Sequence, residues 1–139
     1  MQQKTIAILG AGVWGSALGS LASRNHHQVN FWSRRGDRSL GAVVAGVDTI
    51  ISAVAMAGVR NTIDQLQQVN FPKTVTIVTA TKGLDPITTN TPSKMWQASF
   101  PDHSVVVLSG PNLSKEIELG LPAATVVASQ DIAAAERVQ

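Results

Sequence analysis

The feature that most constrains this 139-residue chain is the loop GAGVWG at residues 10–15, which follows the apolar run TIAIL at residues 5–9. Gly10, Gly12 and Gly15 have the spacing G-x-G-x-x-G. Between a strand and a helix, this spacing gives a tight turn, close approach of a pyrophosphate to the backbone, and close packing of helix on strand. The N–H groups at the helix start favour phosphate. We interpret the loop as a dinucleotide site; a glycine turn chosen only for packing is the alternative.

Short apolar runs alternate with helical patterns along the rest of the chain. The candidate strands are residues 5–9, 29–33, 49–54, 75–79, 105–108 and 124–128, and the main candidate helices are 15–23, 59–68, one starting at Pro92, and 112–119. Such alternation predicts an α/β, Rossmann-type doubly wound, mainly parallel sheet with helices on both faces. We expect residues 1–139 to form one domain. A last helical pattern starts at Ser129 and runs into Gln139, as in a fragment of a longer protein.

Composition excludes several classes of function. With 44% hydrophobic and 14% charged residues, the chain is expected to be globular. The absence of cysteine excludes disulfides and thiolate sites, and the three histidines show no ligand spacing, so we expect no metal site. A net charge of +2 without a basic, aromatic-rich face argues against nucleic acid. We expect no membrane span, no signal peptide and a cytoplasmic location.

The end of the second predicted strand bears on the choice of cofactor. An NAD site usually has Asp or Glu there for the ribose 2′-hydroxyl, whereas this chain has Ser33, Arg34 and Arg35, with no carboxylate before Asp37. Two guanidinium groups can bind a 2′-phosphate through charge-assisted hydrogen bonds. We therefore predict that NADP(H) is preferred and that NAD(H) is possible. A solvated basic loop is the alternative.

Two later strand ends carry further candidates. Lys82 follows the fourth strand and could pair with a substrate phosphate or carboxylate, although a lysine at such a boundary is often merely exposed. The sequence SGPN at 109–112 fixes a turn at the end of the fifth strand. Asn112 would then cap a helix, contact a ligand, or do both, and Gly120 would end that helix. Trp14 would either line the cofactor cleft or belong to the core.

The segments GAGVWGSAL, ATKGLD and LSGPNLSKEIELGLPAATVVAS, in this order, resemble the N-terminal half of bacterial NAD(P)-dependent glycerol-3-phosphate dehydrogenases. The short stretch between the second and third strands resembles cyanobacterial members. The resemblance implies interconversion of dihydroxyacetone phosphate and sn-glycerol 3-phosphate, a phospholipid precursor. Beside the three glycines, the implied cofactor contacts are Val13, Trp14, Arg34, Arg35, Lys82 and Ser114, and the implied substrate contacts are Lys82, Gly110 and Asn112.

The chain departs from the family at Val13, often Ser, at Asn112, commonly Ser or Thr, and at His26, often Gly. The family's catalytic lysine lies in a helical C-terminal domain that this sequence does not contain. We therefore expect cofactor binding with little or no turnover, and an uncovered apolar surface that favours self-association into a homo-oligomer. The alternatives are the cofactor domain of a reductase for another small ketone or keto acid, and a non-catalytic dinucleotide-binding module.

Overall fold

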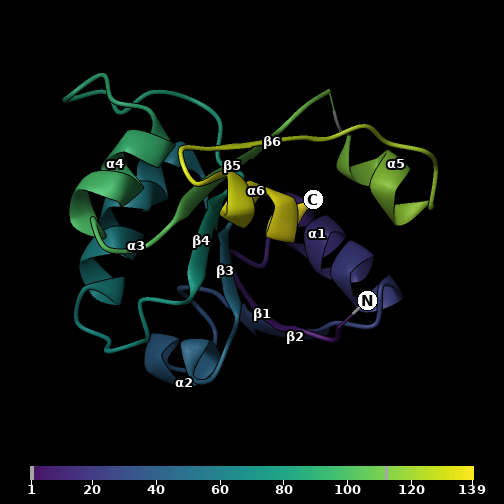
Figure 1. Cartoon of the computed structure of the whole chain (residues 1–139), viewed down its shortest axis with the longest axis horizontal. Helices are drawn as coiled ribbons and strands as arrows, with labels where there is room; N and C mark the ends of the chain where they lie inside the picture. Colours follow the sequence, from purple (N-terminus) through teal and green to yellow (C-terminus); the bar gives the residue numbers. More distant parts are fainter. Residues whose placement is uncertain (1, 112) are drawn as a thin grey trace.

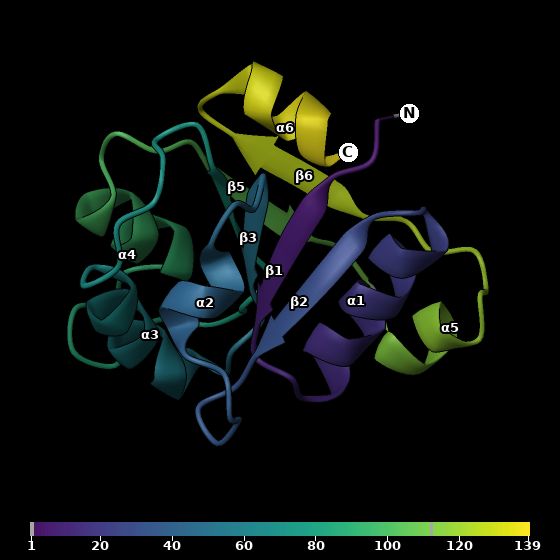
Figure 2. The same ribbon diagram turned by 90° about the horizontal axis from the view of Figure 1, so that it is seen from below.

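A six-stranded sheet forms the centre of the computed structural model, which describes residues 2–111 and 113–139. The strands are β1 (Thr5–Leu9), β2 (Gln28–Trp32), β3 (Thr49–Ser52), β4 (Thr76–Thr79), β5 (Val105–Ser109) and β6 (Val126–Ser129). Their order is β2-β1-β3-β4-β5-β6; the first five are parallel, and β6 runs antiparallel to β5 (Figures 1 and 2). The predicted α/β, doubly wound, mainly parallel sheet is therefore confirmed.

Helices cover both faces of this sheet. They are α1 (Val13–Arg24), α2 (Leu40–Val44), α3 (Val59–Leu66), α4 (Pro92–Ser99), α5 (Ser114–Glu118) and α6 (Ile132–Val138), with a short 3₁₀ turn, η1, at Met56–Gly58. The side chains of β1 alternate between two apolar clusters: Ala7 and Leu9 pack with α2, α3 and α4, whereas Ile6 and Ile8 pack with α1 and α6. Figure 1 shows α3 and α4 on one side of the strands and α1 and α5 on the other.

Local capping explains several helix boundaries. The predicted start at Thr91-Pro92 is confirmed: the Thr91 hydroxyl accepts a hydrogen bond from the Lys94 N–H, and Pro92 occupies the first helical turn. Helix α5 ends at Glu118, with Leu119 at the C-cap, and the predicted stop, Gly120, follows with φ +72°. The predicted cap, Asn112, lies outside the described residues, and Leu113 holds the N-cap position without a side-chain hydrogen bond.

Most of the other elements begin or end one to three residues away from the predicted positions, and β3, α6 and β6 are examples. Strand β3 ends at Ser52, two residues early, and beyond it the Val54 carbonyl accepts a hydrogen bond from the Thr81 hydroxyl at 2.6 Å. Helix α6 begins at Ile132 and not at Ser129, because the Asp131 carboxylate caps it through the Ala134 N–H. Strand β6 is Val126–Ser129, not residues 124–128.

No helix among residues 2–111 and 113–139 is long and apolar enough to cross a membrane.

Candidate functional site

A continuous cleft crosses the carboxyl ends of β1, β3 and β4. One hollow, of about 360 Å³, lies between the glycine loop, the end of β2 and helix α3. A second, of about 440 Å³, lies between the glycine loop and the ends of β3 and β4. Both hollows share Gly12 and residues Ala53, Val54 and Ala55, so together they form the carboxyl-end cleft. After β2 the chain crosses from one side of β1 to the other, which is where doubly wound sheets bind ligands.

The three glycines of the loop are required for different reasons. Gly10 has φ +107°, and a Cβ there would lie 3.0 Å from the backbone of Ala53 and Val54. A Cβ on Gly15 would collide with the carbonyl oxygen of Gly10. A Cβ on Gly12, by contrast, would meet no heavy atom within 4 Å. Packing within the chain therefore explains Gly10 and Gly15 but not Gly12, where space is open for a ligand.

The start of helix α1 faces this open space without a side-chain cap. Gly12 holds the N-cap position, and no acidic residue lies in the first turn. The N–H groups of this turn have no partner within the helix and, with the helix dipole, favour an anion. Val13 is 71% exposed, whereas Trp14 is half-buried. Trp14 both lines the cleft and packs against the apolar cluster under α1.

The basic residues after β2 are placed differently from each other. Arg34 is exposed and lines the cleft beside Ser33 and the glycine loop. Arg35 is also exposed but does not line the cleft wall. Within residues 2–111 and 113–139, neither arginine forms an ion pair with Asp or Glu. The Arg34 guanidinium is thus available to an anion at this end of the cleft.

Lys82 lies at the opposite end of the cleft, after β4. Its ammonium donates a hydrogen bond to the Gly110 carbonyl at 3.1 Å, which brings together two predicted substrate contacts. Gly110 has φ +131°, in the region that favours glycine. Ser114 is the first residue of α5, which packs against α1, and it does not line the cleft. Asn112, between them, lies outside the described residues.

Helix α3 contributes cleft residues that the sequence analysis did not single out. Asn61 and Gln65 line the hollow opposite Arg34, and the Gln65 amide donates a hydrogen bond to the Asn61 side-chain oxygen at 2.6 Å. Gly58 and Thr62 lie on the same helix face. Spacings of three and four residues place these positions together, but only the order of the strands shows that this face borders the cleft.

A buried carboxylate organises the loop that follows Lys82. The Asp85 side chain is only 6% exposed, and it accepts hydrogen bonds from the Thr88 hydroxyl at 2.6 Å, the Thr88 N–H at 2.9 Å and the Arg60 guanidinium at 2.5 Å. The bond from the Thr88 hydroxyl is the main reason that the pKa of Asp85 lies below its usual value, and Arg60 lowers this pKa further.

The described residues contain no group of three or more His, Asp or Glu side chains suited to a metal ion.

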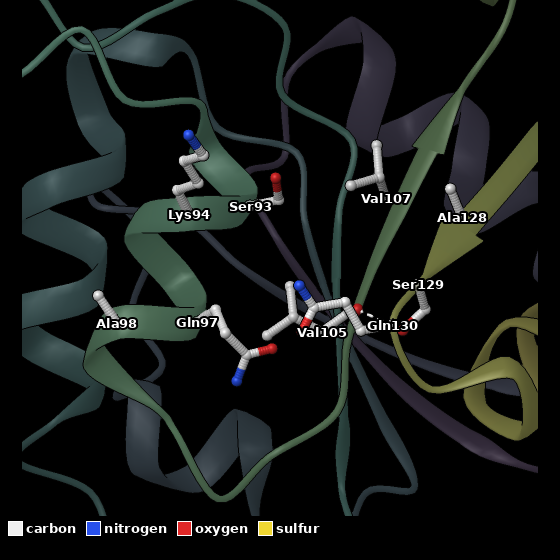
Figure 3. A pocket seen from close by; sticks show the side chains of 9 residues that line it. All are labelled: Ser93, Lys94, Gln97, Ala98, Val105, Val107, Ala128, Ser129 and Gln130. Atoms are coloured by element: carbon white, nitrogen blue, oxygen red, sulfur yellow. Dashed lines mark hydrogen bonds between the residues drawn. The ribbon is translucent and has the colours of Figure 1, made fainter.

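A separate hollow of about 510 Å³ lies between α4 and strands β5 and β6 (Figure 3). Its floor includes Val105, Val107 and Ala128, and Lys94 and Gln97 project from α4 at its wall. The Ser129 hydroxyl there donates to the Val105 carbonyl at 2.7 Å and so joins β6 to β5. This hollow contains neither the glycine loop nor the ends of β1 and β3, so we base the functional argument on the carboxyl-end cleft.

Comparison with known proteins gives close relatives among cyanobacteria. The chain is 56% identical over 139 residues to a protein of Acaryochloris marina and to one of Trichormus variabilis, both named glycerol-3-phosphate dehydrogenase [NAD(P)+]. The matches cover 100% of this chain and 45% of each relative. The chain thus spans a little under half the length of these proteins.

Solved structures show the same fold. The crystal structure of glycerol-3-phosphate dehydrogenase from Coxiella burnetii superposes with a TM-score of 0.88 at 24% identity, covering 98% of this chain and 50% of that one. The family described as NAD-dependent glycerol-3-phosphate dehydrogenase N-terminus matches residues 5–39 and 36–135, which together extend from β1 into the first half of α6. These matches confirm the resemblance found in the sequence motifs, and the chain belongs to this N-terminal family of the NAD-dependent glycerol-3-phosphate dehydrogenases.

Proposed function

We propose that residues 1–139 form the dinucleotide-binding domain of a glycerol-3-phosphate dehydrogenase. The observation that carries this proposal is the continuous cleft that runs from Arg34, past the open backbone at Gly12, to Lys82. It offers a cation at one end, uncapped helix N–H groups in the middle and a second cation at the other end. NADP(H) presents its 2′-phosphate and then its pyrophosphate in this order, and the second cation suits the phosphate of a substrate bound beside the nicotinamide.

The middle of the cleft would hold the pyrophosphate. The first turn of α1 supplies backbone N–H donors, and the absence of a side chain at Gly12 lets an anion reach them. The adenosine end would then lie in the hollow beside Arg34 and helix α3. We propose NADP(H) as the preferred cofactor, because Arg34 lines this hollow and Arg35 follows it in the same exposed loop. NAD(H) would bind through the remaining contacts.

The Lys82 end would hold the nicotinamide and the substrate. Lys82, Gly110 and Asn112 are the proposed substrate contacts there, and dihydroxyacetone phosphate and sn-glycerol 3-phosphate are the proposed substrate pair. Ser114 does not line the cleft and remains a cofactor contact that only the family resemblance implies. A bound nicotinamide supplies or accepts the hydride, and an acid must protonate the developing alkoxide. We assign that acid to no residue of this chain. Because the chain spans 45% of its relatives' length, the activity is proposed for a longer protein, with little or no turnover by these residues alone.

Calorimetric titration with NADPH and NADH tests the cofactor assignment. The variant Arg34→Ala/Arg35→Ala should lose roughly ten- to a hundredfold in NADPH affinity, since a charge-assisted hydrogen bond contributes on the order of 1.5–3 kcal/mol. Its affinity for NADH should change little. Lys73→Ala/Lys94→Ala removes the same formal charge away from the cleft, and we expect it to bind both cofactors like the unmodified chain.

Equal losses for NADPH and NADH in the arginine variant would contradict the assignment of Arg34 and Arg35 to the 2′-phosphate. A similar loss of NADPH affinity in the lysine control would show that the effect follows net charge and not a local contact. Failure of the unmodified chain to bind either cofactor would overturn the proposal that these residues form a dinucleotide site.

A further inference from the structure

The loop between β4 and α4 is held in place by its only strongly buried acidic side chain. Asp85 accepts hydrogen bonds from both the N–H and the hydroxyl of Thr88, and the Asp85 N–H donates to the Asn90 carbonyl at 2.9 Å. The Thr89 N–H donates back to the Asp85 carbonyl at 2.8 Å. These bonds close residues 85–90 into a compact turn, although Leu84 and Ile87 on the same loop are exposed. The turn is therefore held by polar contacts and not by apolar burial.

Arg60 joins this turn to helix α3. Its guanidinium contacts the Asp85 carboxylate at 2.5 Å, from a helix whose other face borders the carboxyl-end cleft through Asn61 and Gln65. Removal of the buried carboxylate would leave its hydrogen-bond donors without an acceptor, so both Arg60 and Thr88 depend on Asp85. We name this contact set, formed by Arg60, Asp85 and Thr88, the Asp85 clasp.

Lys82 lies between two fixed points of the backbone. On one side, the Thr81 hydroxyl donates to the Val54 carbonyl at the end of β3, at 2.6 Å. On the other side, Gly83 turns the chain with φ +125° toward the Asp85 clasp. Only residues 82–84 separate the two anchors, so the direction of the Lys82 side chain depends on both. Its observed contact is the hydrogen bond to the Gly110 carbonyl.

We propose that Asp85 is a positioning residue: through Thr88 and Arg60 it fixes the loop behind Lys82 and thereby holds the Lys82 ammonium at the end of the carboxyl-end cleft. The proposal rests on the ligand-binding role given to Lys82 under the proposed function. Asp85 itself does not contact the cleft, since it is absent from the side chains that line it.

Two readouts test the proposal, one without ligand and one with NADPH. The NMR chemical shift of the Gly110 carbonyl carbon reports the hydrogen bond from Lys82 in the free chain. In Asp85→Asn this shift should move toward the value measured in Lys82→Met. NADPH binding by Asp85→Asn should weaken roughly three- to tenfold, as expected for one weakened polar contact. Because Asp85 acts through Lys82, the double variant should bind no more weakly than Lys82→Met alone.

Asp131→Asn is the matched control, because the Asp131 carboxylate also accepts hydrogen bonds from a hydroxyl, that of Ser104, and from a backbone N–H. It lies at the opposite end of β5 from Gly110, so we expect it to leave both readouts unchanged. Thr88→Val removes only one donor of the clasp and provides a milder variant if Asp85→Asn does not fold; its Gly110 shift should move in the same direction.

An unchanged Gly110 carbonyl shift in both clasp variants would overturn the proposal, as would additive losses of NADPH affinity in the double variant. If the unmodified chain bound no NADPH, the proposed function would fail, and the Gly110 shift would still decide whether Asp85 positions Lys82.

Discussion

Replacement of Gly12 by alanine separates ligand binding from folding at the glycine loop. A methyl group at Gly12 would meet no protein atom within 4 Å, and the φ of −76° and ψ of −169° at this residue suit alanine. We expect the stability of the free Gly12→Ala chain to stay within about 1 kcal/mol of the unmodified chain, because alanine restricts the unfolded chain but is a poorer N-cap residue than glycine. The same methyl group would stand where an anion approaches the first turn of α1.

The expected cost in binding follows from the contacts that the methyl group blocks. If it prevents one backbone N–H from reaching the pyrophosphate, the loss is roughly 1.5–3 kcal/mol, or about ten- to a hundredfold in NADPH affinity. Calorimetric titration measures this loss, and urea unfolding of the ligand-free chain measures its stability. The characteristic result is a large loss of NADPH affinity with little change in stability.

Gly15→Ala provides the contrasting control in the same loop. Its methyl group would collide with the Gly10 carbonyl, so the backbone must shift, and we expect unfolding to become easier by roughly 1–3 kcal/mol even without ligand. The reasoning would be refuted if Gly12→Ala bound NADPH as tightly as the unmodified chain, or if Gly12→Ala and Gly15→Ala destabilised the free chain equally.

Two further predictions concern stability. Thr91→Ala removes the hydroxyl that accepts from the Lys94 N–H and should lower the free energy of unfolding by about 1 kcal/mol, measured by urea denaturation, whereas Thr91→Ser should retain most of it. The second prediction concerns stability at acid pH. The hydrogen bond from the Thr88 hydroxyl, together with Arg60, lowers the pKa of Asp85 from the usual 3.8. Near that pH, the folded chain therefore binds fewer protons than the unfolded chain. This contribution to stability is therefore present above pH 3.8 and is lost as the pH falls through the folded-state pKa. Between pH 6 and pH 3, the urea midpoint should fall less steeply with decreasing pH in Asp85→Asn than in the unmodified chain. Equal slopes in the two proteins would contradict the assignment.

Local sequence patterns predicted much of the fold because the strands of this sheet are buried on both faces. Strand β1 matches its predicted bounds because the run TIAIL supplies both apolar clusters, and the helix start at Thr91-Pro92 is determined by neighbours within one turn. The contacts of the chain just after β3 were not predictable in this way, since the Val54 carbonyl accepts from the hydroxyl of Thr81, 27 residues away. The start of α6, by contrast, depends on a local contact: Asp131 caps the helix through the Ala134 N–H, a signal that the sequence analysis overlooked.

In the candidate site, too, some residues could be predicted from the local sequence and others could not. The glycine loop is contiguous in sequence, so its three positions could be predicted together from their spacing. Asn61 and Gln65 could not, because an amphipathic helix shows which residues share a face but not what that face borders. From the sequence alone, Arg34 and Arg35 were equivalent candidates for the 2′-phosphate, whereas in the structure only Arg34 lines the wall of the cleft.

Helix α1 has a consequence for how the site assembles. Its buried face carries Gly15 and Gly19, and a Cβ at Gly19 would collide with the ring of Phe31 on β2. Two interior glycines each cost a helix on the order of 1 kcal/mol relative to alanine, so this segment has little reason to be helical by itself. It becomes a helix by docking on β1 and β2. The anion-binding end of α1 is thus a product of tertiary structure, and the chain acquires it only when the sheet beneath it has formed.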